Sequence, residues 1–295
     1  MKRKLLTLLL VLALLALAPC ALAQGVSITD MMGRDITLDA PVTRVVAVTA
    51  ADCEILCALG AEDTLVGRGE YCDYPQSVLE VPSVESGAEL NLEQILALEP
   101  QVVLMGTMAQ TAEQVEALQN AGAQVVVSNA QDIEGTYTAI RMIGALVGRD
   151  AEAEALVKDM QDTFAGLDAE PTGKTVYFEV SPLQYGLWTA GANTFMDELA
   201  QMCGLTNAFA DVDGWAAISE EQVLERDPDY IVTISMYFGE GPTPVEEIQG
   251  REGWQGLKAV KDNAIFNADS NQVSRPGPRL KDAALALYAF VKEAK

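Results

Sequence analysis

The sequence predicts an α/β protein of two similar lobes, each built around a mainly parallel sheet. The main observation is a repeat, because the segment 93–103 recurs as 221–231. Each copy reads as a short helix, a proline and then a strand, with Pro100 and Pro228 at the same place. One copy in each half of a 295-residue chain indicates two domains that face each other. In a solenoid the repeat would instead recur about every 20 to 50 residues. The space between two such lobes is a common place for a small ligand.

Alternating strand and helix patterns support the parallel sheets. Val42–Thr49 is an apolar, β-branched run, and the helical stretch that follows it stops at Gly60. The segment Gly67–Pro82 is rich in Gly, Tyr, Pro and Ser and reads as a loop. Further strands are expected at 64–66, 102–105, 124–128, 175–180 and 230–234, and helices at 52–59, 111–121, 193–203 and 279–293. This alternation is typical of a sheet covered by helices on both faces.

Two consecutive helices are expected in the middle of the chain. Residues 133–148 read as one helix, and a second begins at Asp150, a residue type that caps helices, and runs to about Leu167. About 18 helical residues span roughly 27 Å, which is the width of a small domain. The second helix could therefore join the lobes as a rod, or it could be an ordinary amphipathic helix packed on one lobe.

The N-terminus has the pattern of an export signal. A basic stretch at 2–4 precedes an apolar run at 5–18 that is too short to span a bilayer, and cleavage is expected after Ala23. Cys20 is the alternative processing point, where a bacterial lipoprotein would be lipidated. We therefore expect export to the periplasm or to the outer face of the cytoplasmic membrane. The predicted organisation is a signal peptide at 1–23, an N-terminal lobe at 24–149, an interlobe helix at 150–168 and a C-terminal lobe at 169–295.

Composition excludes several classes of function. The chain has 43 acidic and 19 basic residues, a net charge of −24, which becomes −27 when the three basic residues of the signal leave. Such a charge repels phosphate backbones, so no nucleic-acid partner is expected. The absence of histidine excludes imidazole-based metal sites and Ser-His or Cys-His catalysis. We expect neither catalytic residues nor a metal site of the protein's own, and no cofactor.

The four cysteines of the mature chain, Cys53, Cys57, Cys72 and Cys203, are irregularly spaced. Cys53 and Cys57 would lie one helical turn apart, which is a poor geometry for a disulfide, so free, buried thiols are expected. Three of the cysteines are close in sequence. This leaves open a second class of function, an exported redox protein that holds a metal cluster, although the chain has no paired-cysteine motif.

Each copy of the repeat begins with a helix-capping pattern and carries an acid in its first turn. Asn91 and Ser219 each precede a glutamine by three positions, which is the spacing of a capping box. Glu93 and Glu221 therefore lie in the first turns of their helices. Taken singly, such a carboxylate needs no role beyond complementing the helix dipole. One on each lobe, at equivalent positions, also suits a partner with two basic sites.

Five motifs lie in order along the mature chain. They are T-x4-E-I-L-x-A-L-G-A-x-D-x-L-V-G at 49–67, E-Y-C-D-Y-P at 70–75, N-L-E-Q-I at 91–95, S-E-E-Q-V-L at 219–224 and S-R-P-G-P-R at 274–279. The pattern is similar to that of the substrate-binding proteins of ABC importers for cobalamin and iron complexes. The resemblance implies the class III periplasmic-binding-protein fold: two Rossmann-like lobes joined by a single long backbone helix, with little closure on binding. It thereby favours the rod interpretation of the helix after Asp150.

The resemblance also implies roles for individual residues. Glu93 and Glu221 match the positions at which the family docks on arginines of a membrane permease. A metal chelate would be held between the lobes of a monomer and delivered to that permease. The ligand-binding positions that carry over are Tyr71, Trp188, Trp215 and Arg275.

The residues leave the chelate open among cobalamin, a ferric siderophore and heme. Trp188 and Trp215 stand beside glycines, where a loop would present a large apolar surface, and core packing is the alternative for each aromatic. Ferric siderophores are usually anionic and favour arginines, for which Arg68 and Arg279 are candidates together with the carried-over arginine. Arg279 could equally start the last helix on its solvent face. Gly87 stands where cobalamin binders of this kind have a further tryptophan.

Overall fold

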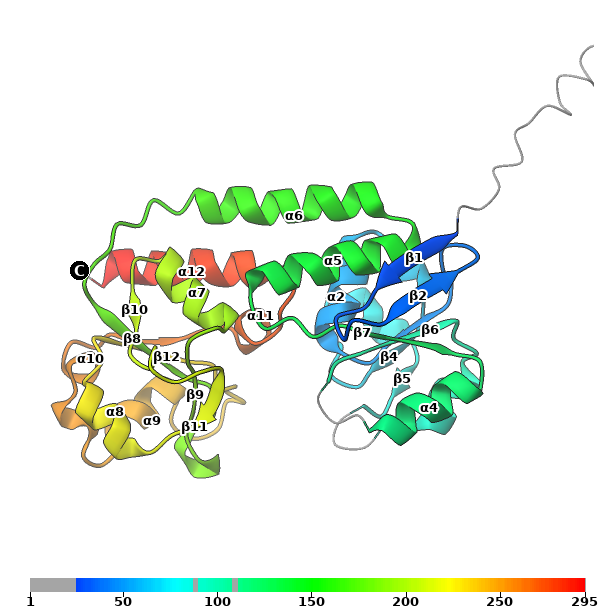
Figure 1. Cartoon of the computed structure of the whole chain (residues 1–295). Helices are drawn as coiled ribbons and strands as arrows, with labels where there is room; N and C mark the ends of the chain where they lie inside the picture. The colour runs from blue at the N-terminus through cyan, green and yellow to red at the C-terminus, as the bar shows by residue number, and fades with distance from the viewer. Residues whose placement is uncertain (1–24, 87–89, 108–110, 295) are drawn as a thin grey trace, which may run out of the picture.

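The chain folds into two α/β lobes under a common layer of long helices (Figure 1). The computed structural model describes residues 25–86, 90–107 and 111–294. The predicted signal peptide at 1–23, Cys20 and Gly87 lie outside the described residues. None of the helices in the described part is both long and apolar enough to cross a membrane.

The N-terminal lobe contains a five-stranded parallel sheet in the order β5-β4-β3-β6-β7. Alternate residues of β3 enter different cores, with Val45 and Ala47 on the face covered by α2 and α5, and Val46 on the face covered by α3 and α4. The strands are β3 (Val45–Ala47), β4 (Leu65–Gly69), β5 (Ser83–Val84), β6 (Val102–Met105) and β7 (Gln124–Val127). The helices are α2 (Ala50–Ala58), α3 (Leu92–Ala97), α4 (Ala112–Asn120) and the 3-10 helix η1 (Glu62–Thr64).

Two features of this lobe differ from the sequence-based expectation. An antiparallel hairpin, β1 (Val26–Thr29) with β2 (Asp35–Leu38), precedes the sheet and was not predicted. The predicted loop at 67–82 is wrong at both ends, because β4 continues to Gly69 and a 3-10 helix, η2, covers Gln76–Glu80. The glycines that suggested a loop lie in a strand where neighbours approach closely, since a Cβ on Gly69 would collide with the Val48 carbonyl oxygen.

The C-terminal lobe repeats the arrangement with a four-stranded parallel sheet in the order β10-β8-β12-β13. Helices α7 and α12 cover one face, and α8, α9, η4 and α10 cover the other. A separate antiparallel pair, β9 (Trp188–Ala190) with β11 (Trp215–Ala217), lies beside the sheet. The other elements are β8 (Thr175–Glu179), η3 (Leu183–Tyr185), α7 (Phe195–Met202), β10 (Thr206–Asn207), α8 (Glu220–Arg226), β12 (Tyr230–Thr233), α9 (Pro244–Gly250), η4 (Trp254–Gly256), α10 (Lys258–Lys261), β13 (Ile265–Asn267), α11 (Ser270–Val273) and α12 (Leu280–Glu293).

The lobes are joined by the helices α5 (Ile133–Val147) and α6 (Asp150–Ala165). Gly148 adopts a left-handed conformation, with φ 68°, which ends α5 and lets the chain turn into α6. Figure 1 shows α6 running from the N-terminal lobe to the C-terminal lobe above α5 and α12. One apolar stripe of α6 is buried, made of Ala153, Val157, Met160 and Phe164. Helix α6 is thus both a bridge and a packed amphipathic helix, and the core on this side of the sheets is continuous through both lobes.

The sequence repeat corresponds to two equivalent structural units, α3 with β6 and α8 with β12. The residues before the two prolines, Glu99 and Asp227, share a left-handed conformation with φ 48° and 42°. The capping differs between the copies. Ser219 forms a full capping box, whereas Asn91 only accepts the Gln94 N–H, because the Gln94 side chain accepts from the Glu85 N–H instead.

Close packing of α5 on α6 generates a first prediction. A Cβ on Gly144 would lie 2.6 Å from the Ala153 Cβ and 3.1 Å from the Arg149 carbonyl oxygen. We expect Gly144→Ala to lower the free energy of unfolding by about 1 to 3 kcal/mol, because the helices must separate. Gly250→Ala is the control, since nothing lies within 4 Å of its Cβ position in α9. Urea unfolding in which both variants are equally stable would contradict the close packing.

Burial of a carboxylate at the start of α2 generates a second prediction. Burial raises the pKa of Asp52 from 3.8 to about 6, and hydrogen bonds from the Thr49 and Ser128 hydroxyls offset only part of this effect. A raised pKa means that the folded state prefers the protonated form. The resulting stabilisation is complete below about pH 4 and is lost as the pH rises through about 6.

Asp52→Asn keeps the shape and removes the charge. We expect this variant to exceed the wild type in free energy of unfolding at pH 8 by up to about 3 kcal/mol, and the difference to vanish near pH 4. Chemical unfolding at a series of pH values measures it. The control is Asp39→Asn, which removes an exposed carboxylate. A loss of stability at every pH would show that the Asp52 carboxylate is needed in its charged form.

Candidate functional site

The carboxyl edges of the two sheets face each other. All strands of each main sheet are parallel, so the loops that follow them leave from one edge. Two groups of contacts join these edges across the lobes. The Gln131 carbonyl oxygen, after β7, accepts the Phe195 N–H at 2.8 Å, and Asp73, after β4, lies 2.6 Å from Arg275, which follows α11. Ligands of open α/β sheets bind outside such edges, so this region is the candidate site.

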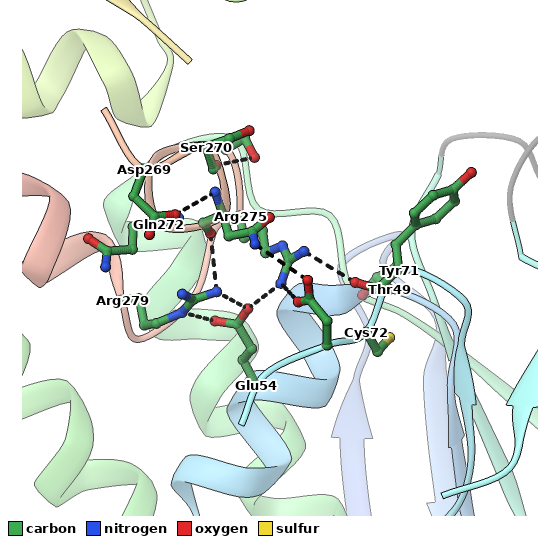
Figure 2. Close-up of polar contacts among 12 residues, drawn as sticks. Thr49, Glu54, Tyr71, Cys72, Asp269, Ser270, Gln272, Arg275 and Arg279 are labelled. Atoms are coloured by element: carbon green, nitrogen blue, oxygen red, sulfur yellow. Dashed lines mark hydrogen bonds and ion pairs between the residues drawn. The ribbon is translucent and has the colours of Figure 1, made fainter. Parts of the chain in front are cut away.

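A cluster of buried charges holds the edges together (Figure 2). Glu54 of α2 accepts from Arg275 at 2.8 Å and binds Arg279 through both oxygens, at 2.6 and 2.8 Å. The side chain of Glu54 is only 3 % exposed, and those of the two arginines are 12 % and 13 % exposed. Burial disfavours the charged form of Arg275, but the hydrogen bonds that this arginine donates to Asp73 and Glu54 outweigh that effect and raise its pKa.

Arg275 is therefore placed beside the candidate site with its charge already paired. Besides the two carboxylates, its guanidinium donates to the Tyr71 carbonyl oxygen at 3.2 Å. Arg279 lies over the Tyr74 ring, 4.1 Å from its centroid. Arg279 is at the N-cap position of α12, so the expected start of this helix is confirmed. The alternative that the Arg279 side chain lies on the solvent face of α12 is wrong, because this side chain is buried against Glu54.

Arg68 lies beneath the loop that carries Tyr71. It is 9 % exposed, and one of its nitrogens donates to the carbonyl oxygens of Gly69 and Cys72, at 3.3 and 3.0 Å. Its buried Nε has no partner. Because Arg68 fixes both sides of the turn, Tyr71 between them is 64 % exposed. Its ring points away from the charged cluster (Figure 2).

The two predicted tryptophans lie on neighbouring strands and not on a loop as expected. Trp188 in β9 forms an isolated β-bridge with Ser181, just past the end of β8, and is 43 % exposed. Trp215 in β11 is half-buried, with its ring 5.3 Å from that of Phe195, whose N–H contacts the N-terminal lobe. The alternative that these tryptophans belong to the core is therefore wrong for Trp188, whereas Trp215 is partly buried and packs against the core.

Sequence reasoning missed a second group of exposed apolar side chains at this edge. Met236, Tyr237 and Phe238 follow β12 and are 58, 46 and 84 % exposed, and Tyr185, in the loop after β8, is 77 % exposed. Their position directly after predicted strands was the available signal, since loops at the carboxyl edge carry binding residues. In the N-terminal lobe Tyr74 adds another ring, at 47 % exposed.

The two acids of the repeat lie at the outer surface of the helices that carry them. Glu93 in α3 and Glu221 in α8 are both exposed. Helix α3 packs on α4, and Figure 1 shows α4 and α8 on the side of the molecule opposite α6. A hydrogen bond from Ser219 and the Glu221 N–H lower the pKa of Glu221, which keeps it charged. Its neighbour Glu220 instead accepts from the Trp254 indole at 2.9 Å.

The four described cysteines are free thiols, as expected. Cys53 and Cys72 are buried and adjacent, and the neighbouring thiols of Cys57 and Cys72 raise the pKa of Cys53. Within the described ranges no group of acidic and sulfur ligands has the geometry to hold a metal ion. This arrangement gives no support to the metal-cluster alternative.

Comparison with known proteins identifies the family. A family model described as periplasmic binding protein matches residues 45–272. The chain is 31 % identical over 264 residues to the uncharacterized ABC transporter substrate-binding lipoprotein YvrC of Bacillus subtilis, covering 86 % of this chain and 82 % of that one. It is 31 % identical over 250 residues to the vitamin B12-binding protein of Salmonella typhi, covering 83 % and 88 %.

A solved structure agrees with these relatives. The crystal structure of a possible iron-binding (periplasmic solute-binding) protein from Staphylococcus epidermidis superposes with a TM-score of 0.72 at 28 % identity, covering 84 % of this chain and 98 % of that one. The sequence matches and this structure cover both lobes. The chain therefore belongs to the periplasmic binding protein family, whose members similar to it include a substrate-binding lipoprotein of an ABC transporter and a vitamin B12-binding protein.

Proposed function

We propose that the chain is the exported substrate-binding component of an ABC import system. It captures a metal chelate, a cobalamin, a ferric siderophore or heme, between its lobes and delivers it to a membrane permease without chemical turnover. The observation that carries the proposal is the set of exposed aromatic side chains on two carboxyl edges that contact each other. Tyr71 and Tyr74 belong to one lobe, and Trp188, Tyr185 and Phe238 to the other. Large apolar faces of this kind suit a bulky chelate better than a bare ion.

The fixed arrangement of the lobes supports binding with little closure. The continuous core along α5 and α6 holds the lobes on one side, and the cluster of Glu54, Arg275 and Arg279 joins them at the carboxyl edges. A site whose walls are already in place loses less conformational entropy when the ligand enters. The chain contains no histidine and offers no Ser-His or Cys-His pair, which agrees with a binding role.

Two outer carboxylates are proposed as docking groups for the permease. Glu93 and Glu221 are exposed, lie in the first turns of equivalent helices and belong to different lobes. A carboxylate in that position can form a bidentate, charge-assisted pair with an arginine. Because the two helices keep a fixed separation, the pair of acids can recognise a transporter with two matching basic sites.

Export is proposed to proceed through the basic and apolar N-terminal segment, with cleavage after Ala23. The relative from Bacillus subtilis is described as a lipoprotein. Lipidation of Cys20 is therefore the alternative, and it would leave the chain anchored to the outer face of the membrane. The mass of the protein recovered from the native membrane and medium distinguishes the two forms.

Binding of a chelate is tested by isothermal titration of the purified chain with cyanocobalamin, hemin and ferric hydroxamate siderophores. We expect Trp215→Ala to reduce the binding free energy of the chelate by about 1 to 3 kcal/mol, because a large apolar contact is lost. Tyr288→Ala is the matched control, since it removes a half-buried ring from α12. Unchanged affinity of Trp215→Ala with a lowered melting temperature would assign Trp215 to the core alone. Binding of free divalent ions but of no chelate would refute the proposed function.

Docking is tested by charge reversal in vesicles that contain the permease. Glu221→Arg places like charges at one contact, so we expect transport to fall by about tenfold or more while chelate affinity stays near wild type. The Glu93→Arg, Glu221→Arg double variant should be worse than either single one. Glu113→Arg is the control, because Glu113 is an exposed first-turn acid of α4 with its own capping box. Normal transport by the double variant would leave both acids with their helix-dipole role alone.

A further inference from the structure

We infer that the site selects a neutral or cationic metal chelate and discriminates against anionic ones. The inference rests on the proposed function and narrows its substrate class. Three observations carry it: the arginines at the carboxyl edges are already engaged, the loops there contain no other cation, and the exposed surface between them is apolar and acidic.

The arginines at these edges have little charge left to offer. Arg275 and Arg279 are matched by the two carboxylates of Glu54 and Asp73, so this group of four has no net charge. Arg68 has no carboxylate partner, but it is only 9 % exposed, and its Nη1 donates to carbonyl oxygens of its own loop. Arg275 and Arg279 cannot both turn toward a ligand without leaving the buried Glu54 carboxylate unpaired, which costs several kcal/mol, roughly 3 to 5.

No further cation is supplied by the loops that follow the strands. The segments 70–75, 106–111, 128–131, 180–187 and 234–243 contain neither lysine nor arginine. At the end of β8, Glu179 is paired at 2.8 Å with Arg251, whose side chain is 3 % exposed. That pair lies below the surface and is balanced.

The exposed groups at the edges are apolar or acidic. Of the eleven large hydrophobic side chains that are exposed in the described part of the chain, seven lie in or beside these loops: Tyr71, Tyr74, Tyr185, Trp188, Met236, Tyr237 and Phe238. Glu70 and Glu240 are exposed in the same loops. An anion placed here would lose hydration without gaining a counter-charge. The net charge of −27 on the mature chain adds long-range repulsion.

A chelate with a neutral or cationic shell avoids both penalties. Its metal charge is cancelled by its own donor atoms, its hydrocarbon surface can pack on the rings, and any ammonium group meets Glu70 or Glu240 or an aromatic face. Anionic ligands, such as ferric catecholates and heme with its propionates, present carboxylate or phenolate charge to the same surface. The exposed side chains therefore favour the first class over the second.

The test uses two pairs of ligands whose members differ in charge, and in the cobalamin pair the shape is almost unchanged. Ferrioxamine B, an iron(III) hydroxamate with a free ammonium group, is compared with its N-succinyl derivative, which ends in a carboxylate. Cyanocobalamin is compared with its monocarboxylic acid. We expect isothermal titration at low salt to give about tenfold or greater preference for the less anionic member of the pair that binds, and the preference to shrink as salt screens the charges.

The outcomes separate the inference from the function on which it rests. Equal or tighter binding of the anionic member would overturn the inference. So would binding of hemin or ferric enterobactin when neither pair binds, and both results would leave the proposed function intact. If no chelate of either charge binds, the proposed function fails and the inference fails with it.

A variant of this chain tests the cause of the selectivity. Asp73→Asn removes one of the carboxylates that neutralise Arg275, and Asp73 is 47 % exposed, so the fold should tolerate it. We expect the ratio of affinities between the less anionic and the more anionic ligand of the pair that binds to fall severalfold. Glu154→Gln is the matched control, since it also removes an exposed partner of an arginine, Arg141, but between α5 and α6. An unchanged preference in Asp73→Asn, or an equal narrowing in both variants, would contradict the role assigned to the paired arginines.

Discussion

The arrangement of the lobes at their carboxyl edges depends on one buried carboxylate. Glu54 is held by Arg275 and Arg279, which follow it in sequence by 221 and 225 positions. Burying these charges is expensive, and pairing recovers the cost only when the geometry is good. The bidentate bond to Arg279 and the second carboxylate of Asp73 on Arg275 provide that geometry. The cluster therefore contributes less to net stability than to fixing one relative position of the two lobes.

The same cluster also places part of the candidate site. Arg275 donates to the Tyr71 carbonyl oxygen, and Arg279 lies over the Tyr74 ring, so the loop after β4 is positioned by side chains of the other lobe. From below, Arg68 fixes the same loop through the Cys72 carbonyl oxygen. Arginines that would suit an anionic ligand are instead used to build the walls. The structural role of these cations and the proposed preference for uncharged or cationic chelates follow from the same bonds.

Local signals in the sequence predicted the fold well, because they act within a few residues. The two copies of the repeat, the parallel sheets and the long helix from Asp150 follow from hydrophobic period and proline placement. The capping role expected of Asp150 is wrong, because Arg149 is the N-cap of α6 and Asp150 is its first residue. Predictions were wrong where glycine serves close packing and not a turn. The glycines beside Trp188 and Trp215 were expected in a loop, yet a Cβ on Gly191 would collide with the Val212 carbonyl oxygen, next to β9 and β11. The pairing of Arg275 with Glu54 could not be predicted either, since nothing local in the sequence identifies a partner in the other lobe.

The number of acidic residues alone does not show where negative charge is exposed at the surface, as two consecutive glutamates illustrate. Glu220 and Glu221 are consecutive at the start of α8, but the first is bonded to the buried Trp254 indole and the second is exposed. Glu93 is the exposed equivalent on α3. The chain has 43 acids, and those at the interlobe cluster are balanced by arginines while those at the outer helix starts are left in solvent. An acidic protein can thus offer an outer surface that attracts a basic partner and, at its inner edges, keep arginines such as Arg275 and Arg279 paired with its own carboxylates.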